Sequence, residues 1–378
     1  MKIFIIYASA GAGHKKAGEA LFEAAKTTAK ECDVELFDAL DYTNPFFKWF
    51  YGASYLFAIN YLSFIWGFFY YSLDCKPVYA LARPLRSLLN FLNSKRLRDK
   101  FINEKPDVII SVHFFASQVA ASLIRKGVLK TKLITVLTDF RPHYVWINRE
   151  THFYTTALDS AKEELSRRGV PEEKVKVYGI PVSPLFSRQE EKNTLRKKLG
   201  FGEKNFVVLT ASGGFGVGPI EKMLERLDKS SLNVEMAVVC GKNQALFEKL
   251  KKAEFNKKIS IFGFVDNMHE LMKASDLIVT KAGGLSVSES LACNLPLVIV
   301  RPVPGQEGRN CRILVQNKLA VKLTRLKDLE NIIFKFIRDK ENNIQAENIK
   351  AIARPRAAFD IMEFAMLYAP CAMRSRII

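Results

Sequence analysis

The sequence KIFIIYASAGAGHKKAGEAL, residues 2–21, joins a run of β-branched and aromatic residues to a glycine-rich turn and an amphipathic stretch. The apolar run predicts a buried strand, and the stretch beyond the glycines predicts a helix. A phosphate-binding P-loop would carry lysine where Glu19 stands, and a dinucleotide-binding turn would carry its third glycine where Lys16 stands. The segment is therefore a strand–turn–helix unit that matches neither motif.

The glycines of this turn leave the start of the predicted helix open. Gly11 and Gly13 lie there, and the backbone N–H groups at a helix start can receive an anion or a sugar hydroxyl. His14 lies at the same start, and its neutral imidazole is suited to act as a general base near pH 7. The alternative is that His14 is an ordinary helix-entry residue, and the turn alone does not decide between the two.

The composition describes a large, basic, globular chain. Its 378 residues favour two or three domains, and 48% of them are hydrophobic, which suffices for buried cores. A formal net charge of +18 indicates nucleic acid or an anionic membrane surface as partner, and no zinc-knuckle, RRM or KH signature favours nucleic acid. The six cysteines form no C-x-x-C pair, so we expect reduced thiols in a cytoplasmic protein. We expect no signal peptide, because the chain begins in a strand.

Short apolar runs alternate with helical stretches along the chain, a pattern typical of parallel sheets covered on both faces. They form two series, which predict two doubly wound α/β domains with a boundary in GIPVSPLF, residues 179–186. A basic helix, TLRKKLG, is expected to follow and to end at Gly200. The predicted strands are KIFIIY, VELFDAL, DVIISVH, KLITVLTD and HFYTTA in the first series, and NFVVLTAS, VEMAVVCG, KISIFGF, DLIVTKAG and LPLVIVR in the second.

One stretch is unusual for such a protein. Residues 49–73 carry no charge and are rich in aromatic side chains. The stretch is long enough to span a membrane, but one crossing would place strands of one sheet on opposite sides. Aromatic residues favour the headgroup boundary, so we expect one or two helices lying in one leaflet; the alternative is a buried aromatic helix pair. The residues expected in lipid are Phe64, Trp66, Phe68 and Phe69, and the basic residues nearby are Lys95, Arg96, Arg98 and Lys100.

The second series carries two glycine turns at strand ends. Gly213 and Gly214 follow Ser212 in one turn, and Gly283 and Gly284 open a helix in the other. In an open parallel sheet, ligands bind at the carboxyl ends of the strands, and helix starts there can hold a diphosphate. The chain has no D-x-D pair for a divalent ion, which fits a diphosphate held without metal. Each turn by itself is better explained as a tight turn that binds nothing.

Polar residues after these turns are suited to a nucleotide sugar. Glu289 lies six residues after Gly283, where its carboxylate can accept both hydroxyls of a ribose. The loop RPVPGQEGRN, residues 301–310, follows the apolar run LPLVIV and offers several donors and acceptors for sugar hydroxyls. These are Gln306, Glu307 and Asn310. The double glycine, the glutamate and the PGQE loop at one sheet edge are together more specific than any part alone.

Five segments resemble one enzyme family. SAGAGHKKAGEAL, LTDFRPHYVWI, GFVDNMHELM, TKAGGLSVSESLA and RPVPGQEGRN are similar to the bacterial processive diacylglycerol glycosyltransferases and the plant monogalactosyldiacylglycerol synthases, which are related to peptidoglycan lipid II synthase. The resemblance implies a GT-B fold, with two Rossmann-like domains facing across a cleft and a C-terminal helix returning to the first. AAFDIMEFAMLY, residues 357–368, is the candidate for that helix.

The resemblance also implies roles by position. His14 matches the proposed general base, and Asp139 lies in an acceptor-side segment; we take both as catalytic. The other residues expected on the acceptor side are Gly11, Gly13, His143 and Trp146. The donor-binding set is Ser212, Gly213, Gly214, Phe264, Val265, Gly283, Gly284, Glu289, Gln306, Glu307 and Asn310, with Glu289 on the ribose and Phe264 and Val265 beside the uracil.

The sequence departs from the family pattern in three places. SVSESLA replaces the commoner SEALA but keeps the glutamate, and the turn ASGGFG differs from the GGSQGA of lipid II synthase. After Gln306 and Glu307 the loop carries Gly308 and Arg309, a change that bears on sugar preference.

The leading hypothesis is an inverting, metal-independent and processive transfer of hexose from UDP-glucose or UDP-galactose to the hydroxyl of diacylglycerol, with no further cofactor. Residues 1–183, with helix 355–378 returning to them, would bind the acceptor and the cytoplasmic face of the cell membrane as a peripheral, monotopic domain. Residues 184–354 would bind the nucleotide sugar. The alternatives are a polyprenyl-diphosphate-linked sugar as acceptor, or a non-catalytic nucleotide-sugar or lipid-binding protein.

Overall fold

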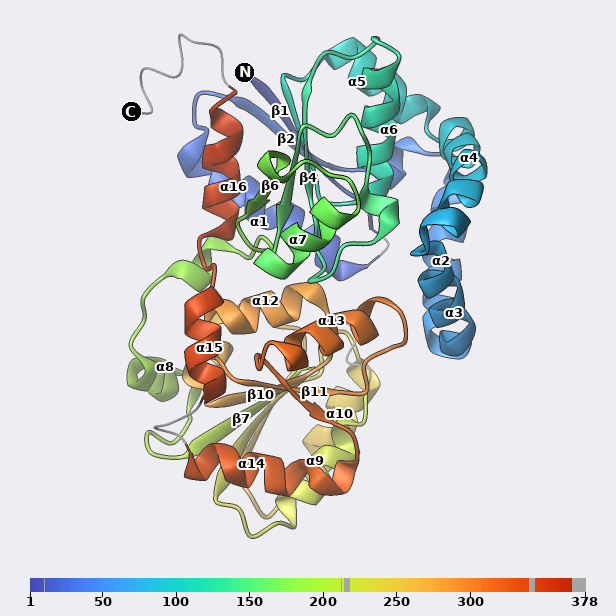
Figure 1. Ribbon diagram of the computed structural model, residues 1–378. Helices are drawn as coiled ribbons and strands as arrows, with labels where there is room; N and C mark the ends of the chain where they lie inside the picture. Colours follow the sequence, from blue (N-terminus) through green and yellow to red (C-terminus); the bar gives the residue numbers. More distant parts are fainter. Residues whose placement is uncertain (10, 212, 214–217, 340–343, 369–378) are drawn as a thin grey trace. The chain divides into compact units, whose positions relative to one another are not determined.

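The computed structural model describes residues 1–9, 11–211, 213, 218–339 and 344–368, which form two compact units (Figure 1). Unit 1 consists of Met1–Pro184, Val303–Arg309 and the segment from Arg356 onward; unit 2 consists of Leu185–Pro302 and Asn310–Pro355. Each unit is built on a six-stranded sheet whose strand pairs run parallel. The predicted α/β class is confirmed.

The sheet of unit 1 has the order β2-β1-β3-β4-β5-β6. Successive side chains of its strand β1 point to opposite faces, as the pleat of a strand requires. Ile3 and Ile5 pack with helices α1 and α16, whereas Phe4 and Ile6 pack with α5 and α6. The sheet is therefore covered on both faces. The strands are β1 (Lys2–Tyr7), β2 (Asp33–Asp38), β3 (Val108–Ser111), β4 (Lys132–Val136), β5 (Phe153–Thr156) and β6 (Val175–Val177); the helices are α1 (Ala12–Thr28), α2 (Pro45–Tyr61), α3 (Ser63–Leu73), α4 (Lys76–Asn93), α5 (Lys95–Glu104), α6 (Phe114–Arg125), α7 (Asp159–Arg167) and α16 (Ala357–Met366).

The sheet of unit 2 has the order β12-β11-β10-β7-β8-β9. Its central strands are entirely buried, and α9, α10 and α14 cover one face. The strands are β7 (Phe206–Ala211), β8 (Val234–Val239), β9 (Ile259–Phe262), β10 (Leu277–Thr280), β11 (Leu297–Val300) and β12 (Val321–Leu323); the helices are α8 (Lys192–Leu199), α9 (Ile220–Asp228), α10 (Gln244–Lys252), α11 (Met268–Ala274), α12 (Gly284–Ala292), α13 (Gln306–Gln316), α14 (Leu329–Arg338) and α15 (Ile344–Ile352). The residues of α13 up to Arg309 belong to unit 1.

All ten predicted strands are present, and the two that the sequence analysis missed are the shortest. Strands β6 and β12 read VKV and VKL, so each has too few apolar residues to give a periodic signal. The basic helix α8 ends as predicted at Gly200, whose φ of 73° is the left-handed conformation that glycine adopts at low cost. The predicted C-terminal helix is α16, which packs against α1.

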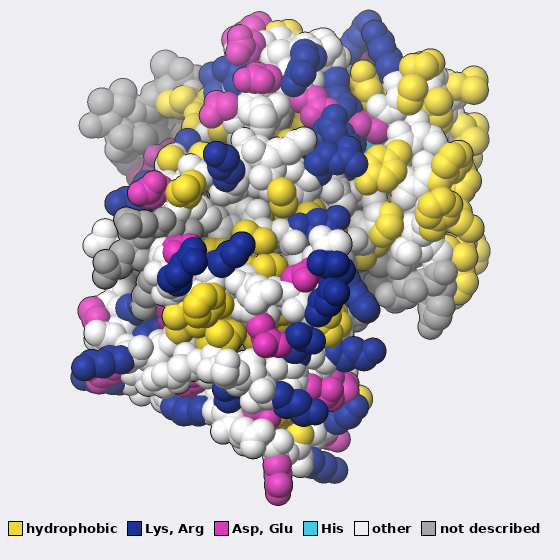
Figure 2. Space-filling view, turned by 60° about the horizontal axis from the view of Figure 1, so that its bottom comes forward, with side chains coloured by type: hydrophobic (Ala, Val, Ile, Leu, Met, Phe, Trp, Pro, Cys, Tyr) yellow, Lys and Arg dark blue, Asp and Glu magenta, His cyan; other side chains and the backbone are white. Residues whose placement is uncertain are grey.

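The aromatic stretch forms the two helices α2 and α3, as predicted, and α4 follows. Within the described part of the chain, none of the helices is both long and apolar enough to cross a membrane. The alternative of a buried aromatic pair is wrong, because Phe64 is 84% exposed and Phe68 is 65% exposed. Figure 2 shows hydrophobic side chains gathered along one side of unit 1, where Figure 1 has α2–α4.

Candidate active site

The carboxyl ends of three neighbouring strands bring the acceptor-side residues of unit 1 together. His14 follows β1, His113 follows β3 and Asp139 follows β4, and these strands are adjacent and parallel. The rings of His14 and His113 meet edge to face, with their centroids 4.7 Å apart. This is the edge at which open parallel sheets place their ligands.

The environment of His14 fixes which of its nitrogens carries the proton. Nδ1 lies 2.9 Å from the carbonyl oxygen of Val112 and 3.1 Å from Oγ1 of Thr138. A carbonyl oxygen can only accept, so Nδ1 carries the hydrogen and Nε2 keeps its lone pair. Burial lowers the pKa of His14 to about 4, against the opposing effect of the bond to Val112. The imidazole is therefore neutral near pH 7, and the lone pair of Nε2 can accept a proton.

His113 is a residue that the sequence analysis did not single out. It is almost fully buried, and its Nδ1 accepts a hydrogen bond from the backbone N–H of Phe115, so it caps α6. Burial, together with the charges of its neighbours His14 and Arg86, lowers its pKa well below the usual range. Its position as the last residue of the predicted strand DVIISVH was the signal that could have identified it.

Asp139 and Gln306 are partners within unit 1. Gln306 donates a hydrogen bond from Nε2 to Oδ1 of Asp139, and Asp139 is 4% exposed. Asp139 also follows Thr138, which contacts His14. The two predicted catalytic residues therefore lie at the same edge of the sheet, after β1 and β4, and one residue of the predicted sugar-binding loop contacts Asp139.

His143 and Trp146 have structural partners. Nδ1 of His143 accepts from the N–H of Val145, so its Nε2 donates to the carbonyl oxygen of Tyr70 in α3, at 2.9 Å. The indole of Trp146 is buried, with its centroid 6.3 Å from that of His14. Both residues shape the surroundings of the site, and their contact with an acceptor stays a prediction. Gly11 is the N-cap of α1 and Gly13 lies in its first turn, so the open helix start is confirmed.

In unit 2 the two glycine turns follow adjacent parallel strands. Gly213 comes after β7, with a φ of 68° that favours glycine, and Gly283 comes after β10, which pairs with β7. Gly213 itself lies in a turn, and the next described helix is α9, which begins at Ile220; the expected helix start after this turn falls on residues outside the described ones and stays a prediction. Ser212 and Gly214 lie outside the described residues.

The second glycine turn does open a helix. Gly283 is the N-cap of α12, Gly284 is its first residue, and Glu289 lies half-buried within it. Asn310 is buried and donates from Nδ2 to the carbonyl oxygen of Ala282, at 3.1 Å. Its amide thus holds this turn, and direct sugar contact by Asn310 stays a prediction.

The remaining donor-side residues lie after the carboxyl end of β9 or in the segment 301–310. Phe264 follows β9 and is 53% exposed, with Nζ of Lys242 6.0 Å from its ring centroid, and Val265 is half-buried. The exposed ring of Phe264 is suited to stack on a planar base.

Glu307 is half-buried and accepts a hydrogen bond from the N–H of Val303 at 2.9 Å.

A cluster of potential metal ligands in unit 2 is already neutralised. Glu190, His269 and Glu270 lie close enough to share an ion. However, Nζ of Lys273 is 2.7 Å from Glu190, and Nζ of Lys198 is 2.6 Å from Glu270. The two ammonium groups already pair with the carboxylates, which disfavours a cation at this place.

The apolar surface of unit 1 extends beyond the predicted aromatic stretch. Helix α4 exposes a row of leucines at helical spacing, among them Leu81, Leu85 and Leu92. On its opposite side Arg86 donates from Nε to Oε1 of Gln118 in α6, at 2.8 Å, which fixes the helix to the unit. The sequence analysis missed this row, although the spacing of the leucines in residues 78–92 was a visible signal.

The predicted basic residues near the aromatic helices differ in whether their side chains are exposed or already paired with protein groups. Lys95 and Arg96 are exposed at the start of α5. Lys100 is wrongly predicted to meet headgroups, because its ammonium group pairs with Glu35 at 2.8 Å and with Glu104 at 2.6 Å. The guanidinium carbon of Arg98 lies 3.8 Å from the ring centroid of Phe91.

Comparisons with solved structures agree with this architecture. The complex of Anabaena HepE with UDP-glucose aligns over 99% of this chain and 100% of its own, with a TM-score of 0.56 and 18% identity. MurG of Acinetobacter baumannii aligns over 96% of this chain and 98% of its own, with a TM-score of 0.59 and 13% identity. Two Rossmann-like units with glycine turns at their strand ends define the chain as a protein of the GT-B fold.

Comparisons of sequence are more specific. The family model for monogalactosyldiacylglycerol (MGDG) synthase matches residues 14–182, and the model for the glycosyltransferase family 28 C-terminal domain matches residues 217–361. The probable chloroplastic monogalactosyldiacylglycerol synthase of Nicotiana tabacum is 30% identical over 376 residues, covering 96% of this chain and 69% of its own. The processive diacylglycerol beta-glucosyltransferase of Bacillus cytotoxicus is 28% identical over 369 residues, covering 96% and 92%. The chain belongs to this family of MGDG synthases and processive diacylglycerol glycosyltransferases.

Proposed function

We propose that this enzyme transfers a hexose from UDP-glucose or UDP-galactose to the hydroxyl group of diacylglycerol, with inversion at the anomeric carbon. The observation that carries the proposal is the neutral imidazole of His14, whose Nε2 lone pair can accept a proton, at the sheet edge that also carries Asp139. The names of its relatives supply the acceptor class, and the UDP and UDP-glucose complexes of HepE support the donor class.

The reaction is a single displacement. Nε2 of His14 takes the proton of the acceptor hydroxyl while the oxygen attacks the anomeric carbon, and the bond from that carbon to UDP breaks. Attack from the face opposite the leaving group inverts the anomeric configuration. UDP departs with the bonding electrons, and the backbone N–H groups at Gly213 and at the start of α12 stabilise its charge.

The apolar faces of α3 and α4 keep the enzyme at the cytoplasmic face of the cell membrane, where its acceptor resides. Unit 1 therefore acts as the acceptor and membrane domain, and unit 2 as the nucleotide-sugar domain. A glycolipid product that stays in the bilayer can return for a second hexose, which makes the enzyme processive.

Incubation with diacylglycerol vesicles and each UDP-hexose, followed by mass analysis of the lipids, tests the proposal. We expect monohexosyl and then dihexosyl diacylglycerol from one of the two donors. Product formed only from a polyprenyl-diphosphate-linked sugar would contradict the acceptor. UDP binding without any turnover would contradict the activity itself.

Replacing Glu289 by alanine is expected to weaken the binding of UDP and of UDP-hexose equally. A carboxylate that accepts from two ribose hydroxyls contributes about 1–3 kcal/mol, the range for charge-assisted hydrogen bonds. Isothermal titration calorimetry measures both affinities. The matched control is Glu330→Ala, which removes a half-buried carboxylate from α14 of the same unit. Unchanged UDP affinity in the Glu289 variant would contradict the ribose role.

Activity is expected to need no divalent metal ion. The proposed leaving-group stabilisation comes from backbone N–H groups, which chelators do not remove. Initial rates with diacylglycerol vesicles should be equal with and without EDTA. Loss of activity in EDTA, with recovery on adding magnesium or manganese, would overturn this account of the departing diphosphate.

A further inference from the structure

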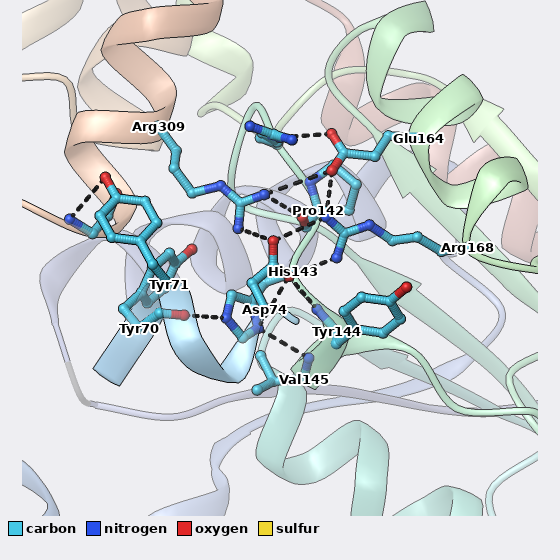
Figure 3. Close-up of polar contacts among 12 residues, drawn as sticks. Tyr70, Tyr71, Asp74, Pro142, His143, Tyr144, Val145, Glu164, Arg168 and Arg309 are labelled. Carbon is cyan, nitrogen blue, oxygen red and sulfur yellow. Dashed lines mark hydrogen bonds and ion pairs between the residues drawn. The ribbon is translucent and has the colours of Figure 1, made fainter. Parts of the chain in front are cut away.

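Arg309 stands where the loop departs from the family pattern, and its side chain is committed to a buried ionic cluster of unit 1 (Figure 3). Its Nη1 lies 2.6 Å from Oδ2 of Asp74, and its Nη2 donates to the carbonyl oxygen of Pro142 at 3.3 Å. The side chain is 3% exposed. Arg309 therefore holds the loop in place through its contacts with Asp74 and Pro142, and its buried side chain does not contact a sugar directly.

Asp74 is the centre of this cluster. It follows directly after α3 and pairs with Arg168 through both carboxylate oxygens, at 2.6 and 2.9 Å, and it accepts from the N–H of Tyr144 at 3.0 Å. Burial opposes ionisation, but the hydrogen bond from Arg168 and the charges of Arg309 and Arg168 hold the pKa of Asp74 below its ordinary value. Asp74 is thus an anion that ties the end of α3 to the loop through Arg309.

The loop also lies directly against the inner face of α3. A Cβ added to Gly67 would lie 2.8 Å from Cβ of Pro304, so only glycine allows this approach. A Cβ on Gly305 would lie 3.2 Å from Nε1 of Trp66, which is half-buried and faces the loop rather than the exposed side of the helix. The phenol oxygen of Tyr71 lies 3.4 Å from the backbone nitrogen of Gly305. Helix and loop form one packed layer within unit 1.

The two faces of α3 thus have different contacts. Its outer face exposes Phe64, Phe68 and Phe69, and its inner face holds the segment Val303–Arg309, which contains Gln306. A surface that binds Phe64, Phe68 and Phe69 also restrains α3, against which the segment Val303–Arg309 packs. We propose that Arg309 and Gly67 couple the two faces: docking of α3 on a lipid surface fixes the loop and with it the amide of Gln306, which raises affinity for the donor hexose. Arg309 is in this sense a positioning residue.

The coupling rests on the proposed function, because it assigns Gln306 to the hexose. It predicts that lipid binding and hexose binding strengthen each other by the same factor, as linkage requires. UDP, which lacks the hexose, should not respond. If vesicles raise the affinity for UDP-hexose but not for UDP, the effect acts on the hexose contact and is not a general stabilisation of the fold.

The test is calorimetry of UDP-glucose, UDP-galactose and UDP with the whole chain, alone and with phosphatidylglycerol–phosphatidylcholine vesicles that contain no diacylglycerol, so that no transfer occurs. For the wild type we expect vesicles to raise UDP-hexose affinity at least about fivefold, the lower end of usual coupling factors, and to leave UDP affinity unchanged. No response of UDP-hexose affinity to vesicles would overturn the coupling.

Two variants and two matched controls localise the effect. Arg309→Gln removes the charge pair with Asp74, and Gly67→Ala pushes Pro304 away while favouring the helix; both should abolish the vesicle response. Arg141→Gln leaves the Arg309–Asp74 pair in place, because Arg141 pairs with Glu164, and Gly52→Ala places a Cβ in open space in α2. Both controls should keep the response.

The outcomes are distinguishable. A vesicle response retained in folded Arg309→Gln would refute the role of Arg309, and one retained in Gly67→Ala would refute the packed layer as the route. Arg309→Lys keeps the charge without the planar fork and should restore part of the response. If Arg309→Gln failed to fold by circular dichroism, Gly67→Ala would carry the test. Failure of the wild type to bind any UDP-hexose would refute the proposed function as well as the coupling.

Discussion

Replacing His14 by alanine is expected to lower kcat by about 10²–10⁴-fold, the usual contribution of general-base catalysis. The variant loses an imidazole whose Nδ1 donates to the carbonyl oxygen of Val112 and whose Nε2 can therefore accept a proton. UDP affinity should stay within about twofold, because the ribose and diphosphate contacts proposed here lie in unit 2. Initial rates with diacylglycerol vesicles, together with UDP calorimetry, measure the two effects.

The matched control is His152→Gln, which removes another imidazole of unit 1 whose Nδ1 accepts from the N–H of Leu133. It should retain nearly full turnover. Near-normal turnover in His14→Ala would remove His14 from the mechanism, and an equal loss in both variants would indicate a general effect on the unit.

The pH profile of the wild type gives a second measure of His14. The base acts in its neutral form, and burial lowers the pKa of His14 to about 4. The imidazole therefore stays competent as pH falls from 7 to 5 and is lost only as pH falls through the folded-state pKa. The acid limb of kcat/KM should lie well below the ordinary histidine value of about 6.5. An acid limb near that value would contradict a buried His14 as the base.

Changing Phe64, Phe68 and Phe69 to serine is expected to release the enzyme from lipid vesicles. A fully buried large apolar side chain contributes about 1.5–3 kcal/mol, so losing three should weaken membrane binding by several kcal/mol, more than about 100-fold. Vesicle sedimentation measures the bound fraction. UDP binding should persist, since the proposed donor site lies in unit 2.

The control replaces Val315, Phe334 and Ile344, three exposed apolar residues of unit 2, and should leave vesicle binding unchanged. Wild-type binding should strengthen with anionic lipid, by about 1 kcal/mol for each of Lys95 and Arg96, and weaken without vanishing in high salt. Sedimentation of the triple α3 variant with vesicles would contradict attachment through this face. Resistance of the wild type to both salt and carbonate would contradict a monotopic protein.

Much of the architecture follows from local patterns in the chain. The ten longer strands were predictable because runs such as KIFIIY and FVVLTA are apolar on both faces, which only a covered parallel sheet accommodates. The roles of His14 and Asp139 were predicted from the family resemblance, and the structure places both at one sheet edge, where parallel strands end together. The two strands that were missed, VKV and VKL, are too short for periodicity to identify.

Other features depend on partners distant in sequence. Composition predicts that residues 49–73 prefer an interface, but not that Phe64 faces outward while Trp66 faces Gly305. Lys100 has the charge to meet a headgroup, and only the fold shows that Glu35 and Glu104 already hold it. The orientation of a side chain on a helix is decided by what packs against that helix.

The sequence by itself determined the two parallel α/β sheets, the open helix start at Gly11, and the uncharged aromatic helices α2 and α3. These depend on periodicity and backbone preference, which neighbouring residues set. Tertiary structure decided which nitrogen of His14 is free, through Val112, and that Arg309 reaches Asp74. Such pairings form between chain segments that meet only after folding. The sequence therefore does not show which distant group will pair with a given charge or ring nitrogen.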